Sequence, residues 1–547
     1  MKQTLVRKRI EFALFSLITL LNLLPFVFTK FFPSMDGASH LANSNIINQV
    51  TVHSNDFFRQ FFILNPEPVP NWISHFLVSL MTLVIPAFLA EKIVILLILT
   101  GIPFAFRALI HTLSPGHRLF SYLVFPFTHS MFFFFGFFNF CMGILVFLIT
   151  LNYWLKQEKR NWNPKSVLYL ALLVALCYFS HIVIFGILMI ALATQIVIST
   201  LAGMISEGRT WKSQIRQALR NSAAALLSAA LPLALFIYFF YSRPEIRDIK
   251  FLSKEELLNM IVALRPLVSM NPAIEGKFLQ ILFYALLFIL VAGFLRFVFR
   301  LFHDAPADEP DTKTGNTSES LLPRYPFWWI LSFLVVLLVL FFKLPDAYGT
   351  ASYTNLRIGF FILLFTVVWF STFRIPWFLG LITVLAGLTV NTLLLKYYTP
   401  GIRDLGRMAT ECNKASEFVK PNSLVLPIYC MDNWFTGHFV DYLAVDKPVV
   451  MVYNYECESG YFPVRWNENR RKNYYLGNPS FPDRYIHFEI VKNRPSLPLD
   501  YVFIVGQYDP AKDWFFSTLH KALTEDYTRL YQAENCSLYG RKSAATY

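Results

Sequence analysis

The fold is decided by the first apolar stretch of the chain and the polar segment directly after it, "FALFSLITLLNLLPFVFTKFFPSMDGASH", residues 12–40. The run 12–29 is long enough to cross a bilayer. It follows the basic start "MKQTLVRKRIEF", and no small-residue cleavage site comes after it, so we expect an uncleaved first helix with its N-terminus in the cytoplasm. The run leads into Asp36 and His40, which are therefore expected near the opposite surface of the membrane.

The composition excludes a soluble globule. Hydrophobic residues make up 55% of the chain and charged residues only 15%, whereas a soluble chain carries about 25% charged residues. Repeated apolar runs of about 20 residues predict a polytopic α-helical membrane protein. The net charge of +13 collects in short loops between these runs, which is the positive-inside pattern and no sign of nucleic-acid binding.

The basic loops also set the expected topology. "KQEKRNWNPK" (156–165) is expected in the cytoplasm, so an even number of crossings must separate the first helix from the helix that ends at Trp154. Three candidates lie between them, so one does not cross. We expect this to be 72–89, an interfacial or re-entrant helix; the alternative is 119–134. The count gives about 11 crossings, with the N-terminus inside and the C-terminus outside.

The chain divides by composition into a transmembrane module, 1–399, and a C-terminal domain, 400–547. In the C-terminal domain, short runs rich in Val, Ile and Tyr ("SLVLPIYC", "KPVVMVYNY", "DYVFIVGQY") alternate with helical stretches such as "AKDWFFSTLHKAL", which predicts a small extracytoplasmic α/β domain. The transmembrane module is expected to carry outer loops at 31–90 and 243–277 and a cytoplasmic linker at 301–325, which holds an acidic, Pro- and Ser-rich stretch typical of disorder.

Two smaller features accompany this division. "SKEE" (253–256) is a capping-box pattern and predicts a surface helix in the second outer loop. Four cysteines lie in the C-terminal domain, where disulfides are open to them, but their pairing cannot be read from the sequence: Cys412, Cys430, Cys457 and Cys536.

Several functional classes lack their usual signals. The sequence has no phosphate-binding P-loop, HExxH, paired CxxC or GxSxG motif. Few ionisable residues lie in the middle of apolar runs, which weighs against an ion-coupled pump or symporter.

Five stretches, in their order along the chain, resemble the GT-C superfamily of integral membrane glycosyltransferases, which includes protein O-mannosyltransferases, oligosaccharyltransferase catalytic subunits and aminoarabinose transferases. They are "SMDGASHLAN" after the first helix, "NPEPVPNWISH" at the end of the first loop, "FFGFFNFCMG" (134–143), "CYFSHIVIF" (177–185) and "YTNLRIGFF" (353–361). The "WWD" motif of oligosaccharyltransferases is missing. Many members have two adjacent acidic residues in the first loop, but here Gly37 follows Asp36, so the need for a divalent cation stays open.

The resemblance implies an inverting enzyme of the cell envelope, embedded in the plasma or inner membrane. It would move a sugar from a polyprenyl-phosphate-linked donor to a glycan, lipid or protein acceptor on the extracytoplasmic face. Transfer needs a base for the acceptor hydroxyl and positive or donor groups for the departing phosphate. We expect Asp36 as the base with His40 beside it, because the two are spaced i, i+4 on one helix face.

We expect Arg357 and His181 at the donor phosphate, because both stand where outer loops meet the membrane. Each assignment has a structural alternative: a helix cap for Asp36, a lipid-facing interfacial arginine for Arg357, and a backbone-bonded histidine for His40 and His181. Further candidates are Asp346, which is also typical of a turn, Asp56, His75 and Asn139.

Two other functions fit the same pattern. A transporter or flippase of lipid-linked saccharides shares the apolar bundle, but it needs no carboxylate at the outer headgroup layer. A non-catalytic membrane scaffold would use the C-terminal domain to bind a partner.

Overall fold

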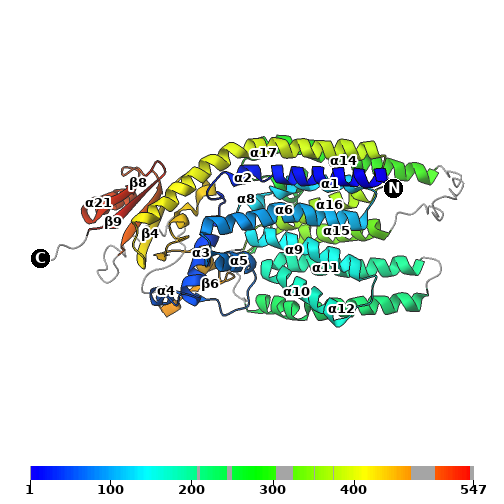
Figure 1. The fold of residues 1–547 in the computed structure, drawn as a ribbon, viewed down its shortest axis with the longest axis horizontal. Helices are drawn as coiled ribbons and strands as arrows, with labels where there is room; N and C mark the ends of the chain where they lie inside the picture. The colour runs from blue at the N-terminus through cyan, green and yellow to red at the C-terminus, as the bar shows by residue number, and fades with distance from the viewer. Residues whose placement is uncertain are drawn as a thin grey trace. The chain divides into compact units, whose positions relative to one another are not determined.

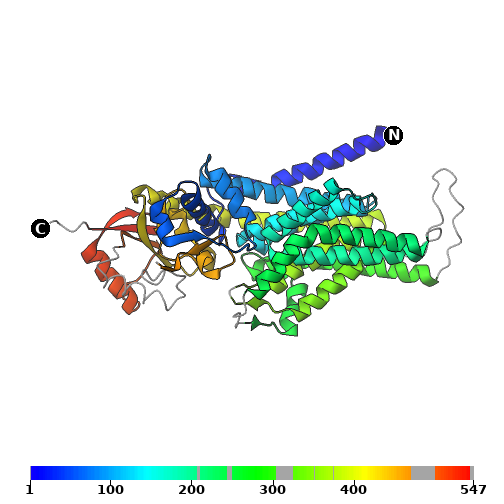
Figure 2. The same cartoon turned by 90° about the horizontal axis from the view of Figure 1, so that it is seen from below.

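A computed structural model describes the chain as helices and one principal sheet (Figures 1 and 2). The described residues are 2–205, 210–242, 249–302, 325–349, 351–373, 375–469 and 499–542; the predicted linker stretch 304–320 lies outside them. They form two compact units, each made of several stretches of chain. The first unit consists of Met1–Asn22, Ile98–Met131 and Gly143–Lys396, and the second of Leu23–Leu97, Phe132–Met142 and Tyr397–Tyr547.

Long apolar helices make the chain an integral, multi-pass membrane protein. Within the described ranges, nine helices are long and apolar enough to cross a membrane. They are α1 (Lys2–Leu21) with its continuation α2 (Leu24–Val27), α6 (Ala87–Leu113), α9 (Phe138–Gln157), α11 (Ile182–Ile205), α12 (Trp211–Tyr241), α14 (Pro272–Phe302), α15 (Tyr325–Lys343), α16 (Thr354–Ser371) and α17 (Trp377–Lys414).

The apolar run 119–134 is not one continuous helix. The segment consists of a 3₁₀ helix (Arg118–Val124), α7 (Phe125–Thr128) and α8 (Met131–Phe134). Pro126 has no N–H and cannot donate the backbone hydrogen bond that a continuous α-helix needs at this point. The residues from Phe120 to Phe134 are all buried, and irregular backbone is tolerated at membrane depth where protein covers it.

This broken segment nevertheless lies alongside α17 inside the first unit. Phe120 lies against Gly380, and Leu123 lies so close to Gly387 that a Cβ there would be 2.5 Å from its Cδ2. The two glycines are seven residues apart, which is about 10 Å along a helix. The segment therefore advances along the bundle although it is not one helix.

The helix α5 (Ile73–Thr82) agrees with the prediction that 72–89 does not cross. It has ten residues, about 15 Å of helix, whereas the hydrocarbon core is about 30 Å thick. The apolar helix α10 (Pro164–Ser180) has seventeen residues and is shorter than the nine long helices. The prediction of about 11 crossings therefore needs both α10 and the broken segment in addition to those nine.

In the first unit, the predicted outer loop 243–277 pairs with the segment that follows α15. The strand β2 (Ile249–Lys250) lies antiparallel to β3 (Ala347–Tyr348). The predicted surface helix is present as α13 (Lys254–Val262), and its capping box is formed by Ser253 and Glu256. The capping-box prediction is confirmed.

The C-terminal strands form a five-stranded sheet in the order β5-β4-β7-β9-β8. The predicted strands are β4 (Ser423–Cys430), β5 (Val449–Met451) and β7 (Tyr501–Gly506), which run parallel, and the predicted helix is α21 (Trp514–Asp526). The sequence missed the antiparallel hairpin β8 (Tyr527–Gln532) and β9 (Cys536–Arg541). All six cysteines are free thiols, with Cys412 and Cys536 beside each other.

The first loop belongs to the same unit as this sheet and shares its core. Its elements are α3 (Gly37–Thr51), α4 (Asp56–Phe61), β1 (Phe62–Leu64) and α5, and β1 pairs antiparallel with β6 (Val464–Trp466). Phe62 stacks on Trp466 with ring centroids 4.8 Å apart. Ile46 and Phe58 join the sheet residues Val502 and Ile504 in one buried cluster. This packing brings α3 and the segment 430–460 into one polar site.

Candidate active site

The backbone around Asp36 is held in place by the segment 132–136. The Asp36 N–H donates to the carbonyl of Phe135 at 3.0 Å. Gly136 has φ +78°, and a Cβ there would lie 2.7 Å from the backbone nitrogen of Gly37. Only a glycine allows this approach without strain, so the "FFGFF" motif fixes the position at which α3 begins.

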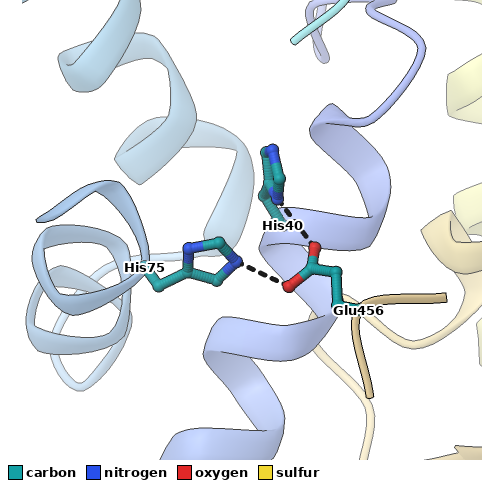
Figure 3. A group of neighbouring side chains, drawn as sticks. All are labelled: His40, His75 and Glu456. Atoms are coloured by element: carbon teal, nitrogen blue, oxygen red, sulfur yellow. Dashed lines mark hydrogen bonds and ion pairs between the residues drawn. The ribbon is translucent and has the colours of Figure 1, made fainter. Parts of the chain in front are cut away.

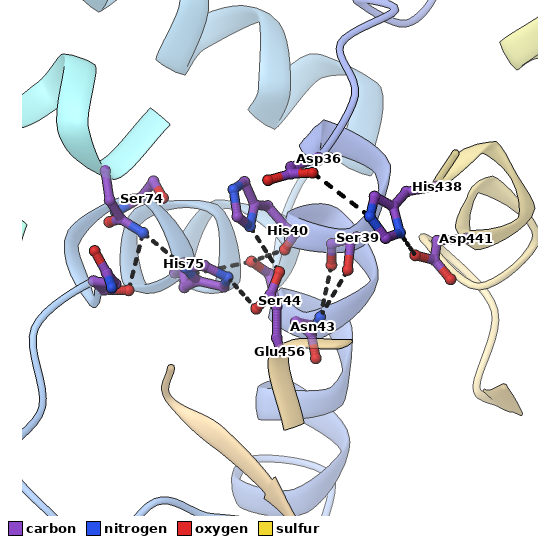
Figure 4. A network of polar contacts seen from close by, with 12 residues as sticks. Asp36, Ser39, His40, Asn43, Ser44, Ser74, His75, His438, Asp441 and Glu456 are labelled. Carbon is purple, nitrogen blue, oxygen red and sulfur yellow. Dashed lines mark hydrogen bonds and ion pairs between the residues drawn. The ribbon is translucent and has the colours of Figure 1, made fainter. Parts of the chain in front are cut away.

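Asp36 occupies the N-cap position of α3, but its carboxylate makes no capping hydrogen bond to that helix. Its side chain is 9% exposed, and Oδ1 lies 3.6 Å from Nε2 of His438. The other ring nitrogen of His438 lies 3.8 Å from Oδ2 of Asp441. Figure 4 shows the three side chains in a row. The cap alternative for Asp36 therefore lacks the hydrogen bond that would define it.

Burial keeps His438 and its other neighbour, Asp441, uncharged near neutral pH. Burial lowers the pKa of His438 to about 4, although the charge of Glu456 partly opposes this shift. Burial, followed by the negative charge of Glu456, raises the pKa of Asp441 to about 8. The ring of Tyr455 packs against that of His438 in a tilted arrangement, with ring centroids 4.5 Å apart.

A second buried group lies one helical turn along α3. Nδ1 of His40 is 2.7 Å from Oε1 of Glu456, and Nε2 of His75 is 2.8 Å from Oε2 of the same carboxylate (Figure 3). The side chains of Glu456 and His75 are fully buried, and that of His40 is 6% exposed. Burial alone would raise the pKa of Glu456, but the adjoining imidazoles of His75 and His40 lower it by more, to below its usual range.

Glu456 is carried by α18 (Tyr455–Ser459). The N-cap Asn454 accepts the N–H of Glu456 at 3.0 Å, and its amide donates to Oδ1 of Asn43 on α3 at 2.8 Å. These bonds connect the short helix to α3 and turn the carboxylate toward the two histidines.

Asn139 fixes the hydrogen on His75. Its Oδ1 accepts the backbone N–H of Ser74 at 2.8 Å, so its Nδ2 is the donor, both to the carbonyl of Asn71 at 2.9 Å and to Nδ1 of His75 at 3.2 Å. Nδ1 of His75 is therefore an acceptor. The hydrogen lies on Nε2, which donates to Glu456.

This hydrogen-bond pattern decides whether the group suits a metal ion. Within the described part of the chain, His40, His75 and Glu456 are the one set whose ligand atoms lie close enough together, within 4.8 Å. A metal on Nε2 of His75 would move the hydrogen to Nδ1, where it would face the amide donor of Asn139. The three residues fit a hydrogen-bonded chain and do not fit a divalent cation.

The structure brings together four of the residues selected from the sequence: Asp36, His40, His75 and Asn139 all lie in this part of the second unit. Asp56 does not join them; it is an exposed residue in the first turn of α4. Sequence reasoning missed the partners from the C-terminal segment: His438, Asp441, Tyr455 and Glu456.

The remaining selected residues belong to the first unit. His181 ends α10, and its Nδ1 accepts the N–H of Val183 at 3.1 Å. The charge of Arg357, in the first turn of α16, acts on His181, and the guanidinium donates to the carbonyl of Ser352. The carboxylate of Asp346 accepts the N–H of Asn355 at 3.2 Å, as a turn residue would.

No protein-family model matches the sequence, and no curated protein matches it at the sequence level. The structure, in contrast, is similar to the crystal structure of ArnT from Cupriavidus metallidurans bound to undecaprenyl phosphate. The TM-score is 0.52, with 97% of this chain and 98% of ArnT covered and 9% of residues identical. The chain has the ArnT fold. The GT-C-like fold, with its membrane helices and small C-terminal domain, is therefore confirmed.

One prediction concerns the protonated carboxyl in this site. A pKa of about 8 for Asp441 in the folded protein, against an ordinary 3.8, favours folding fully below about pH 4, and this contribution is lost as the pH rises toward 8. Asp441→Asn removes this dependence. The wild type should lose stability between pH 5 and pH 8.5, and the variant should lose less. We expect the two losses in the free energy of unfolding to differ by about 1–3 kcal/mol. Thermal unfolding in detergent at both pH values measures the difference, and parallel pH profiles would contradict the assignment.

Proposed function

We propose that this chain is an integral membrane glycosyltransferase that moves a sugar from a polyprenyl-phosphate-linked donor to an acceptor on the extracytoplasmic face. The observation that carries the proposal is the ArnT fold over 97% of the chain. The ArnT structure holds undecaprenyl phosphate, which is the class of lipid phosphate that such a donor releases. The acceptor is a hydroxyl of a glycan, lipid or protein.

The proposed reaction is a single displacement with inversion at the anomeric carbon. The acceptor oxygen forms a bond to that carbon, the bond between the carbon and the phosphate oxygen breaks, and the phosphate leaves with the electron pair. The acceptor proton passes to the carboxylate of Asp36. Asp36 suits this role because its carboxylate does not cap α3 and its neighbours His438 and Asp441 are uncharged near neutral pH.

We assign the negative charge of the leaving phosphate to Arg357, with His181 beside it. A guanidinium offers two parallel donors to a phosphate, which an ammonium cannot. The electrostatic contact between Arg357 and His181 supports a common role for the two residues.

The test is transfer by the purified chain in liposomes, with a panel of radiolabelled polyprenyl-phosphate sugars and an extract of glycan, lipid and protein acceptors. We expect at least one donor to release polyprenyl phosphate while its label moves to an acceptor. Asp526→Asn, an exposed carboxylate at the end of α21, is the matched control and should keep full activity. Movement of intact donor across the bilayer would indicate a flippase, and binding without either process would indicate a scaffold.

The proposed sidedness gives a labelling prediction. Exposed positions Asn259 on α13 and Glu525 on α21 are expected outside the cell, and Asn161, in the basic loop before α10, inside. Single cysteines there, in a background lacking the native cysteines, should react with an impermeant maleimide in intact cells at 259 and 525 but not at 161. Labelling of position 161 from outside would overturn the topology.

A further inference from the structure

The buried group His75–Glu456–His40 forms a hydrogen-bond chain with a single direction. The amide of Asn139 donates to His75, so Nε2–H of His75 donates to Oε2 of Glu456. Each oxygen of Glu456 lies within hydrogen-bond distance of an imidazole nitrogen, so its carboxylate accepts at both oxygens. Nδ1 of His40, 2.7 Å from Oε1, must then carry a hydrogen.

The other nitrogen of His40 is the end of this chain. Within the described residues, Nε2 of His40 has no hydrogen-bond partner, and the side chain is 6% exposed. Figure 4 shows the ring of His40 with this nitrogen turned away from Glu456, on the side where Asp36 lies. Asp36 stands one helical turn before His40, and its carbonyl accepts the N–H of His40 at 3.0 Å.

The ring of His40 is also held by packing. Its centroid lies 6.1 Å from that of Phe138 and 6.0 Å from that of Phe462. Two aromatic rings and one ionic hydrogen bond leave the imidazole little freedom to turn. Nε2 is thus presented in a fixed direction.

We propose that Glu456 is a positioning residue that holds a hydrogen on Nδ1 of His40 and directs its Nε2–H to the oxygen of the departing phosphate. This inference rests on the proposed function of Asp36. During transfer the bond from the sugar carbon to the phosphate oxygen breaks, and that oxygen keeps the electron pair. The imidazolium of His40 donates a hydrogen bond to it without giving up its proton, and the acceptor proton goes to Asp36. The ionised carboxylate of Glu456 stabilises the imidazolium.

The first test is Glu456→Gln, which keeps the size of the side chain and removes its charge. We expect kcat and kcat/KM to fall together by about 10- to 100-fold, because the interaction with His40 acts in the transition state. Glu456→Asp keeps the charge and should restore part of the activity, whereas Glu525→Gln, at an exposed site, should change nothing.

The second test separates positioning from a purely structural role. In a His40→Gln background, Glu456→Gln should cause no further loss, because Glu456 acts through His40. Equal losses in both backgrounds would overturn the proposal. So would a stoichiometric metal ion in the purified wild type, measured by plasma mass spectrometry, that Glu456→Gln removes.

The third test does not depend on activity. In 15N-histidine-labelled protein in liposomes, the signals lost in His40→Gln should show hydrogen on both Nδ1 and Nε2 in the wild type, and Glu456→Gln should no longer hold the hydrogen on Nδ1. If the wild type shows both hydrogens but transfers no sugar, the proposed function fails while the positioning geometry stands. If the hydrogen lies on Nε2 alone, the positioning inference fails whatever the activity.

Discussion

Asp36→Asn should lower sugar transfer by about 10²- to 10⁴-fold, the usual effect of removing a general base. The asparagine amide has the same shape but cannot accept the proton of the acceptor hydroxyl at neutral pH. Donor binding should be retained, because the proposed contacts to the phosphate belong to other residues. Transfer under saturating donor, with donor binding measured in parallel by scintillation proximity, gives the two quantities separately.

Asp36→Glu should recover little of this loss. The start of α3 cannot shift to accommodate a longer side chain, because the N–H of Asp36 is bonded to Phe135 and Gly37 lies against Gly136. The carboxylate would therefore be displaced by about the length of one methylene group, and a base must lie within hydrogen-bond distance of its proton. Transfer by Asp36→Asn within a few-fold of the wild type would remove Asp36 from the reaction. Asp56 and Asp346 would then be the next carboxylates to replace.

The second large effect is expected at Arg357. Arg357→Ala should lower kcat/KM for the donor by a factor that corresponds to about 2–4 kcal/mol, roughly 30- to 1,000-fold. Arg357→Lys should recover only part, because lysine offers a point charge in place of a planar pair of donors. Steady-state kinetics with varied donor concentration measures both.

The matched control for Arg357 is Lys277→Gln, an exposed basic residue of the same unit. It should leave the kinetics unchanged. If Arg357→Ala keeps full activity in detergent and in anionic liposomes, the arginine is an ordinary interfacial residue that contacts membrane lipid.

Local sequence patterns predicted most of the elements. The Val- and Ile-rich runs at β4, β5 and β7 and the capping box before α13 were recognised because their signals lie within a few residues. The break in the segment 119–134 was not recognised because its hydropathy is that of a membrane helix, while Pro126 and the complete burial of the segment allow a broken path.

The residues of the candidate site also differ in whether a local sequence signal marks them. Asp36 and His40 could be selected because they follow the first helix at helical spacing. Glu456 and His438 could not, because about 400 residues of chain separate them from α3 and nothing in "YECESGYF" or "GHFVDYL" marks them locally. The meaning of Asn139 also depends on structure: only its two backbone partners, the N–H of Ser74 and the carbonyl of Asn71, fix its amide and so the hydrogen of His75.

The central claim is that the chain breaks the bond between a sugar and a polyprenyl phosphate, and 31P NMR follows this bond directly. The donor is a phosphodiester and the product a phosphomonoester, so their signals are distinct. With a donor and acceptor identified from the panel, the wild type should convert the diester signal completely into the monoester signal, and Asp36→Asn should leave the diester unchanged over the same time. A diester signal that persists with the wild type, for every donor and acceptor in the panel, would contradict the account.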